Sequence, residues 1–247
     1  VVLYRNSLNE KVLNIVVDSL PDLFRLSNLV KYNSKYDVIN ATIMKGDYSV
    51  FPDSKILFEM DYGVLILSGE GARIFVNSPN DNDETQFLTT TAHSSVIIIG
   101  LTIEGFNIAI HNKGGLNIFN STFNNNKVDY NKKEDYGGAI VNDNGASVTI
   151  YNSSFSGNYA KYGGAVYNSG TAKVFISNFT NNEGYDSDSN VDIFNNQTAV
   201  SVFSVGHYPD VKDKFPRAAW KQDLLYVGIT LSITLIYFVI FLIISHS

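Results

Sequence analysis

The hexapeptide GGAIVN at residues 137–142 returns 26 residues later as GGAVYN at residues 163–168. Fainter copies are AIHN at residues 109–112 and DIFN at residues 192–195. Self-similarity at a period of roughly 20–50 residues is typical of solenoid and other repeat architectures. We therefore interpret these four segments as equivalent positions in successive structural repeats.

A second pattern, with the common core Phe-x-x-Asn, follows each of the first three copies. It reads NSTFNNN at 120–126, NSSFSGN at 152–158 and NFTNN at 178–182. A short alternating strand lies between the two patterns, at 116–119, 148–151 and 173–176. Strands of about 4–5 residues cannot bury a core alone, but stacking one coil on the next pairs each strand with its counterpart about 4.8 Å away. The repeats thus predict an all-β fold, a parallel β-helix.

In such a stack, equivalent residues form files that run from coil to coil. We expect one set of apolar residues to point inward: Ile110, Ile118, Phe123, Ile140, Val148, Ile150, Phe155, Val166, Ile176 and Phe179. The chain contains 28 Asn. Asn at a repeated turn position can form an amide ladder between coils, and both Asn and Gly tolerate the left-handed backbone of tight bends.

The first half of the chain fits less regular coils of the same solenoid. The apolar runs at 64–76 and 96–105 each contain or end in Gly, as buried parallel strands do. Upstream, Ser19 followed by Asp22 resembles a capping box, and apolar residues then recur at helical spacing. We predict an amphipathic helix from Leu20 to Tyr32 that closes the open end of the solenoid.

These patterns divide the chain into four segments. We expect an N-terminal segment with the capping helix at 1–37, the β-helix at 38–207, a polar linker at 208–223 and a transmembrane helix at 224–245. The first 18 residues give no clear pattern.

The predicted transmembrane helix runs from Leu224 to Ser245, 22 residues without a charge. A helix of that length spans about 33 Å, enough for a hydrocarbon core of about 30 Å. Trp220 and Tyr226 stand near one end, where aromatic belts form. The alternative is a buried core helix. Basic residues precede the span, which by charge alone favours a cytoplasmic domain. Either a leader is missing from this sequence or the protein is tail-anchored; we expect a missing leader and an extracellular domain.

Composition narrows the function. The chain has 247 residues, a net charge of −6 and only 17% charged residues, and it has no Cys. Disulfides, Cys-ligated zinc and thiol catalysis are excluded. The absence of a basic stripe disfavours nucleic-acid binding.

The paired GGA and Phe-x-x-Asn motifs resemble those of right-handed parallel β-helix surface proteins. They are similar to the repeats of polymorphic outer-membrane proteins and more so to adhesin-like proteins of methanogenic archaea. The run from Gly46 to Tyr48, followed by 67–71, also resembles the opening coils of pectate-lyase-like folds. The resemblance covers about residues 20–205. It implies a single-pass protein of the cell membrane with its β-helix outside the cell.

Five Asn-x-Ser/Thr triplets are candidate glycosylation sites in an exported protein: Asn40, Asn120, Asn152, Asn178 and Asn196. Asn-rich turns also generate such triplets by chance. Four tyrosines are a candidate sugar-stacking face: Tyr151, Tyr159, Tyr162 and Tyr167. The alternative is packing of the rings against one another between coils. His111 is expected to point outward from its strand.

No catalytic constellation, cofactor site or metal site is recognisable. The acidic residues Asp129, Glu134 and Asp135 fall in the longest insertion but lie among lysines, so they fit a solvated loop as well as a glycosidase pair. Nothing marks Arg73 as the base of a lyase. The stretches Asn80 to Glu84 and Asp186 to Asp188 offer oxygen ligands for Ca²⁺ but follow no EF-hand pattern.

Three functions fit these observations. The first is adhesin-like, non-catalytic binding of a glycan or protein on a neighbouring surface. The second is a structural subunit of an envelope or membrane complex. The third is a polysaccharide-active enzyme of the pectate-lyase-like class, which predicts paired carboxylates within about 10 Å of each other.

Overall fold

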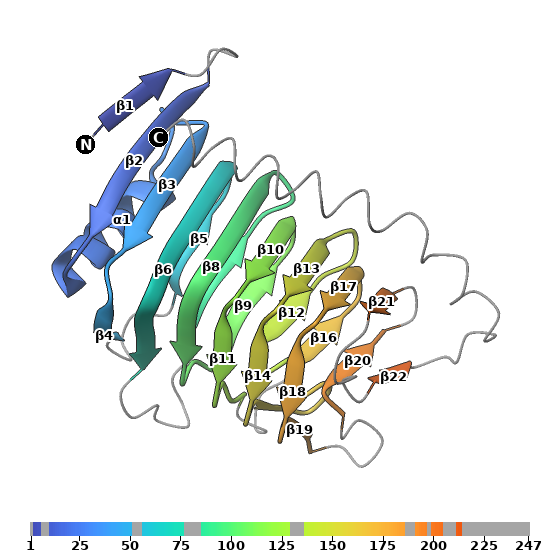
Figure 1. The fold of residues 1–247 in the computed structure, drawn as a ribbon. Helices are drawn as coiled ribbons and strands as arrows, with labels where there is room; N and C mark the ends of the chain where they lie inside the picture. Colours follow the sequence, from blue (N-terminus) through green and yellow to red (C-terminus); the bar gives the residue numbers. More distant parts are fainter. Residues whose placement is uncertain are drawn as a thin grey trace. The chain divides into compact units, whose positions relative to one another are not determined.

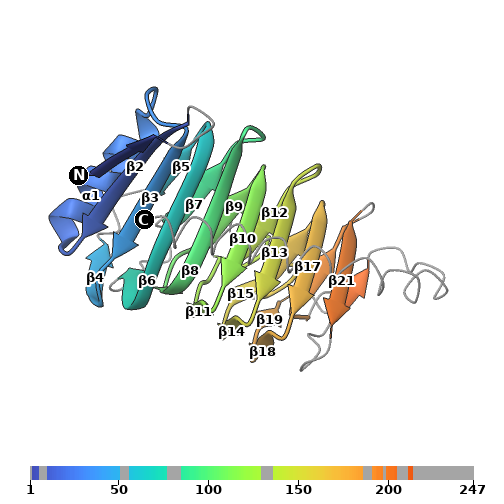
Figure 2. The same ribbon diagram turned by 45° about the horizontal axis from the view of Figure 1, so that its top comes forward.

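The computed structural model describes residues 2–5, 10–50, 56–76, 85–128, 136–185, 191–196, 199–204 and 211–213. They belong to one compact unit, Val1–Phe215. Within it, short strands stack in chain order, one coil after the next (Figure 1). A second view shows two layers of strands, one behind the other (Figure 2). The predicted transmembrane helix lies outside the described residues, and no helix among those residues is long and apolar enough to cross a bilayer.

A 13-stranded sheet, here called sheet A, forms one layer. Its strands are β1 (Val2–Arg5), β2 (Lys11–Val17), β3 (Val38–Ile43), β4 (Gly46–Val50), β6 (Gly63–Val76), β8 (Ser94–Glu104), β10 (Gly115–Phe119), β11 (Thr122–Asn124), β13 (Ser147–Tyr151), β14 (Ser154–Ser156), β17 (Thr171–Phe175), β18 (Asn178–Thr180) and β21 (Val200–Ser204). Apart from the antiparallel β1–β2 pair, its strands pair in parallel.

A 7-stranded parallel sheet, sheet B, forms the other layer. Its strands are β5 (Ile56–Met60), β7 (Gln86–Thr90), β9 (Ile108–Asn112), β12 (Ile140–Asn142), β16 (Val166–Asn168), β20 (Ile193–Asn195) and β22 (Val211–Asp213). A small third sheet pairs β15 (Tyr159–Ala160) with β19 (Glu183–Gly184). Neighbours in each ladder come from successive coils, which confirms the predicted parallel β-solenoid. The ladders begin at β2 and extend to β22, beyond residues 38 and 207.

The core is built from files of apolar side chains. On sheet B, Ile110, Ile140, Val166 and Ile193 stand in register and are fully buried. On sheet A, the rings of Phe123, Phe155 and Phe179 stack with centroids 4.9 and 4.8 Å apart and interplanar angles of 4°. The Phe residues of successive Phe-x-x-Asn repeats are therefore in register and stack on one another in the core.

Two ladders of buried asparagines run between the coils. In the first, Asn142 Nδ2 donates to Asn168 Oδ1 at 2.8 Å, and its own Oδ1 accepts from Asn112 Nδ2 at 2.7 Å. The second joins Asn126, Asn158 and Asn182 in the same way, at 2.9 and 2.8 Å. Because each amide is satisfied by the coils on either side, burial carries no penalty for an unpaired polar group. The predicted amide ladder is confirmed.

Other asparagines have a different role, because they turn the chain. Asn120 and Asn152 have φ of 49° and 45°, in the left-handed region. The equivalent residue of the next coil is Ile176, with φ of 50°. The prediction that Ile176 points into the core is wrong: its side chain is 52% exposed. The alternation of the strand ends at Phe175, and Ile176 occupies the turn instead.

The Gly-Gly pairs are required by close approach of the backbone. Gly137 and Gly163 have φ of 50° and 63°, and a Cβ on Gly137 would lie 2.1 Å from the carbonyl oxygen of Ile140. A Cβ on Gly138 would lie 2.5 Å from the carbonyl oxygen of Gly164 in the next coil. No side chain fits there, which explains why this dipeptide marks the repeat.

Helix α1 (Leu20–Lys31) confirms the predicted helix. Ser19 caps its first turn, and Leu23, Leu26 and Val30 are buried against the core. The Ser27 hydroxyl donates to the carbonyl oxygen of Leu57 in β5, the first strand of sheet B. The helix therefore covers the edge at which sheet B begins, as a cap must.

Candidate functional site

The outer face of sheet B carries acidic, hydroxyl, imidazole and aromatic side chains. One file on the side of sheet B away from the core runs in register through six strands: Glu59, Thr89, His111, Val141, Tyr167 and Phe194. Val141 and Phe194 are buried, and the other four are partly exposed. The file is polar in the early coils and aromatic in the later ones. Side chains on this file are fixed to successive strands of a rigid ladder, so their relative positions are set by the register.

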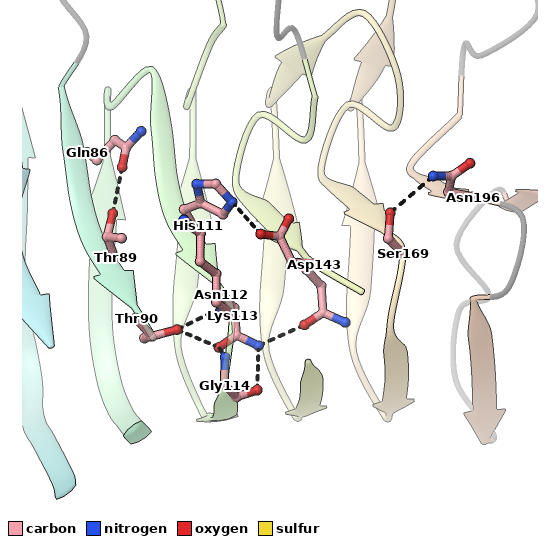
Figure 3. Close-up of polar contacts among 11 residues, drawn as sticks. Gln86, Thr89, Thr90, His111, Asn112, Lys113, Gly114, Asp143, Ser169 and Asn196 are labelled. Atoms are coloured by element: carbon pink, nitrogen blue, oxygen red, sulfur yellow. Dashed lines mark hydrogen bonds and ion pairs between the residues drawn. The ribbon is translucent and has the colours of Figure 1, made fainter. Parts of the chain in front are cut away.

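The polar half is held by one contact between neighbouring coils and one hydrogen bond within β7 (Figure 3). The ring of His111 lies with Nε2 3.0 Å from Asp143 Oδ2, in the turn after β12. Thr89 Oγ1 donates to Gln86 Oε1 at 2.7 Å. Both His111 and Asp143 remain partly exposed. This half of the face presents a donor–acceptor pair to solvent.

The ladder beneath holds these groups in place. Asn112 Oδ1 accepts from Thr90 Oγ1 at 3.0 Å, and Asn112 Nδ2 contacts the carbonyl oxygen of Gly114 at 3.2 Å (Figure 3). The backbone N–H of Asp143 donates to the Asn112 carbonyl at 2.9 Å. The turn that bears Asp143 is therefore fixed to the strand that bears His111.

The aromatic half is a cluster of four rings: Tyr136, Tyr162, Tyr167 and Phe194. The ring centroids of Tyr136 and Tyr167 are 4.4 Å apart, and those of Tyr162 and Phe194 are 5.2 Å apart. The rings of Tyr167 and Phe194 are nearly parallel, at 8°. The three tyrosines are half-buried. Burial raises the pKa of Tyr167, and the hydrogen bond to Ser169 opposes that rise.

The four tyrosines of the predicted sugar-stacking face do not share one face. Tyr162 and Tyr167 belong to the sheet B cluster. Tyr151 lies in sheet A beside Phe119, with centroids 6.4 Å apart, and Tyr159 lies in β15 against Tyr185. Each of these rings packs against an aromatic ring of a neighbouring coil.

Sequence reasoning missed Tyr136, Phe194 and the His111–Asp143 pair. The signal for the first was present, because Tyr precedes the Gly-Gly pair in both strong repeats, YGGAIVN and YGGAVYN. Phe194 occupies the position of Tyr167 in the faint last copy. His111 points outward as predicted, but its pairing with Asp143 depends on a turn in the next coil.

Arg73 stands among acids on the outer face of sheet A. Its Nε lies 2.9 Å from Glu104 Oε2, and a terminal nitrogen lies 3.5 Å from Asp47 Oδ2. The guanidinium carbon is 4.0 Å from the ring centroid of Phe75. The hydrogen bond to Glu104 raises the pKa of Arg73. A catalytic base needs the opposite shift, so this arrangement holds Arg73 as a cation.

The remaining chemical candidates fall outside the described residues. They are the acids Asp129, Glu134 and Asp135 and the two stretches proposed for Ca²⁺, Asn80 to Glu84 and Asp186 to Asp188. Within the part of the chain that the structure describes, no three His, Cys, Asp or Glu residues gather as metal ligands would.

The geometry defines a class of protein, the parallel β-solenoids. Comparison with known protein families, curated proteins and solved structures finds no significant match.

Proposed function

We propose that this protein is an adhesin-like surface protein that binds, without catalysis, a glycan or protein on a neighbouring surface. The β-helix is right-handed, as parallel crossovers are in about 98% of cases, and it lies outside the cell. The segment from Leu224 to Ser245 anchors it in the membrane as a single span. The resemblance to adhesin-like proteins of methanogenic archaea supports this location.

The outer face of sheet B is the observation that carries the proposal. Tyrosines give a binding surface a large, rigid and amphipathic contact area, and Ser, Asn and His add hydrogen bonds. Tyr136, Tyr162 and Tyr167 provide the first, and His111 with Asp143 provides the second. Because the ladder fixes all of them before a ligand arrives, little conformational entropy is lost on binding.

A structural role is the second candidate, and the ring contacts favour it specifically. The ring of Tyr167 already packs against the rings of Tyr136 and Phe194 of the same chain. In a subunit of an envelope or membrane complex, the same face would be covered by another chain. A polysaccharide-active enzyme has less support, because the acids nearest Arg73 are engaged in ion pairs with it.

Binding by the 247-residue chain in lipid nanodiscs tests the proposal. Glycan arrays and cognate cell surfaces serve as ligands, with polysaccharide depolymerisation assayed on the same sample. Tyr162→Ala should weaken binding by at least about tenfold, as expected for a tyrosine at the centre of an interface. Tyr62→Ala is the matched control, because Tyr62 is 58% exposed and lies in the turn before β6.

The outcomes separate the three functions. Binding lost in Tyr162→Ala and kept in Tyr62→Ala supports adhesion through sheet B. Loss of stability with unchanged binding assigns the rings to packing and favours the structural role. Release of oligosaccharides from any substrate contradicts a non-catalytic function.

A further inference from the structure

The five Asn-x-Ser/Thr triplets are equivalent in sequence but not in structure. N-glycosylation requires the side-chain nitrogen, Nδ2, of the asparagine to be accessible and a hydroxyl residue two positions later. The environment of Nδ2 therefore distinguishes one triplet from another.

Three of the triplets have an Nδ2 that is already engaged. Asn40 Nδ2 donates to Asn14 Oδ1 at 2.8 Å, and Asn152 Nδ2 donates to Asn120 Oδ1 at 2.9 Å. Asn196 Nδ2 lies 3.3 Å from Ser169 Oγ, and its Oδ1 is buried without a hydrogen-bond partner among the described residues. A sugar on any of these nitrogens would have to fit beside the partner or displace it.

Asn120 is intermediate. It is exposed, and its Oδ1 accepts the hydrogen bond from Asn152. Asn120 lies in the bend before β11, and β11 pairs with a strand on each side, β8 and β14. A glycan there would lie against the amide of the next coil.

Asn178 differs from the other four. It is exposed in β18, and none of the hydrogen bonds that join the described residues involves its side chain. Thr180, the hydroxyl residue of the triplet, is also exposed. Because alternate residues of a strand point to the same face, Asn178 and Thr180 lie together outside, while Phe179 between them is buried and stacks on Phe155.

The backbone around Asn178 is also the easiest of its file to open. Among the described strands, β18 is the last of its file and pairs only with β14. It has three residues, and left-handed turns at Ile176 and Asn181 bound it. Short edge segments with few hydrogen bonds open locally at low cost, which lets a modifying enzyme take up the triplet.

We infer that Asn178 is the acceptor of an N-linked oligosaccharide. Nδ2 loses a proton and bonds to the anomeric carbon of an oligosaccharide donated from a lipid phosphate carrier. The bond from that carbon to the phosphate breaks, and the lipid phosphate departs with the electron pair. In the cell this modification rests on the proposed extracellular location, and it leaves the outer face of sheet B free.

The test uses the purified full chain in detergent, an oligosaccharyltransferase and a lipid-linked oligosaccharide, with glycopeptides mapped by mass spectrometry. Asn178 should be occupied at least about fivefold more than Asn40, Asn152 or Asn196, the factor that one net hydrogen bond contributes. Thr180→Val should abolish occupancy of Asn178 while keeping the shape of the side chain. Asn152→Gln should leave it unchanged.

Two outcomes overturn the inference. One is preferential occupancy of Asn40, Asn152 or Asn196. The other is an unmodified Asn178 in a chain whose added flexible triplet, placed before Val1 as a positive control, is modified. Since this assay is independent of cellular location, its failure leaves the adhesive proposal standing. A second arm maps the chain from an N-glycosylating host: modification in vitro but not in those cells contradicts the extracellular location and leaves the site assignment intact.

Discussion

At the scale of the residue, the tight bends of the solenoid require a left-handed backbone. A residue other than Gly, Asn or Asp loses about 1–2 kcal/mol in that conformation. Asn120 and Asn152 fit the requirement, and their amides bond to each other across coils. Ile176 does not fit it, since β-branched side chains are true outliers at positive φ.

We therefore expect Ile176→Asn to stabilise the protein by about 1 kcal/mol. The new amide also falls in register with Asn152 and can extend the exposed pair by one coil. Chemical denaturation measures the change in the free energy of unfolding. Val16→Asn is the control: Val16 is 63% exposed but lies in extended strand β2, so the same substitution should not stabilise there. Equal effects at the two positions would contradict the role of backbone strain.

The phenol of Tyr167 gives a prediction about pH. Burial raises its pKa above the ordinary value, with the nearby Ser169 opposing. Because the pKa of Tyr167 is higher in the folded state, the protonated phenol contributes to stability. This contribution is fully present below about pH 10, the unfolded pKa, and is lost as pH rises through the folded pKa. In an ultraviolet titration of phenolate formation, Tyr167→Phe should remove a late component. Loss of an early component instead would show that the ring is not buried in this way.

At the scale of the element, repetition made much of the structure predictable. The repeated hexapeptide and the Phe-x-x-Asn pattern located the strands from β9 to β18, and Ser19 located the start of α1. The candidate binding face was less predictable. His111 and Asp143 are 32 residues apart, and no local pattern reports a contact that depends on the register between coils.

The ends of the solenoid were hard to predict for a related reason. Apolar residues alternate only weakly along β2, so the sequence does not mark it as a strand of the solenoid. Its parallel pairing with β3 shows that it belongs to the first coil. The error at Ile176 has a local cause: an apolar residue at the end of an alternating strand gives no sign that the chain has already turned.

Helix α1 offers a direct test of the cap. Ser19 accepts the backbone N–H of Asp22, and loss of such an N-cap costs about 1 kcal/mol. Ser19→Ala should lower the free energy of unfolding by that amount, as measured by urea denaturation. Ser34→Ala, at an exposed position after the helix, is the control and should change little. A neutral Ser19→Ala would mean that the cap contributes nothing to the stability of this end.

At the scale of the whole molecule, the account depends on the vertical registry of the coils. The core files, the amide ladders and the candidate binding face all exist because equivalent residues lie directly over one another. A solenoid of this kind has stability built from nearest-neighbour interfaces, so a change in one coil is felt first by the coils on either side of it.

Cysteine cross-linking measures that registry most directly, because the natural chain has no Cys. Thr122 pairs with Ser154, and Ser154 pairs with Asn178. Coils about 4.8 Å apart fall within the Cα separation that a disulfide spans, about 4.4–6.8 Å. Under mild oxidation, Thr122→Cys with Ser154→Cys should form a disulfide in monomeric protein, and Thr122→Cys with Asn178→Cys, two coils apart, should not. A bridge in the second pair but not in the first would contradict the stacked solenoid.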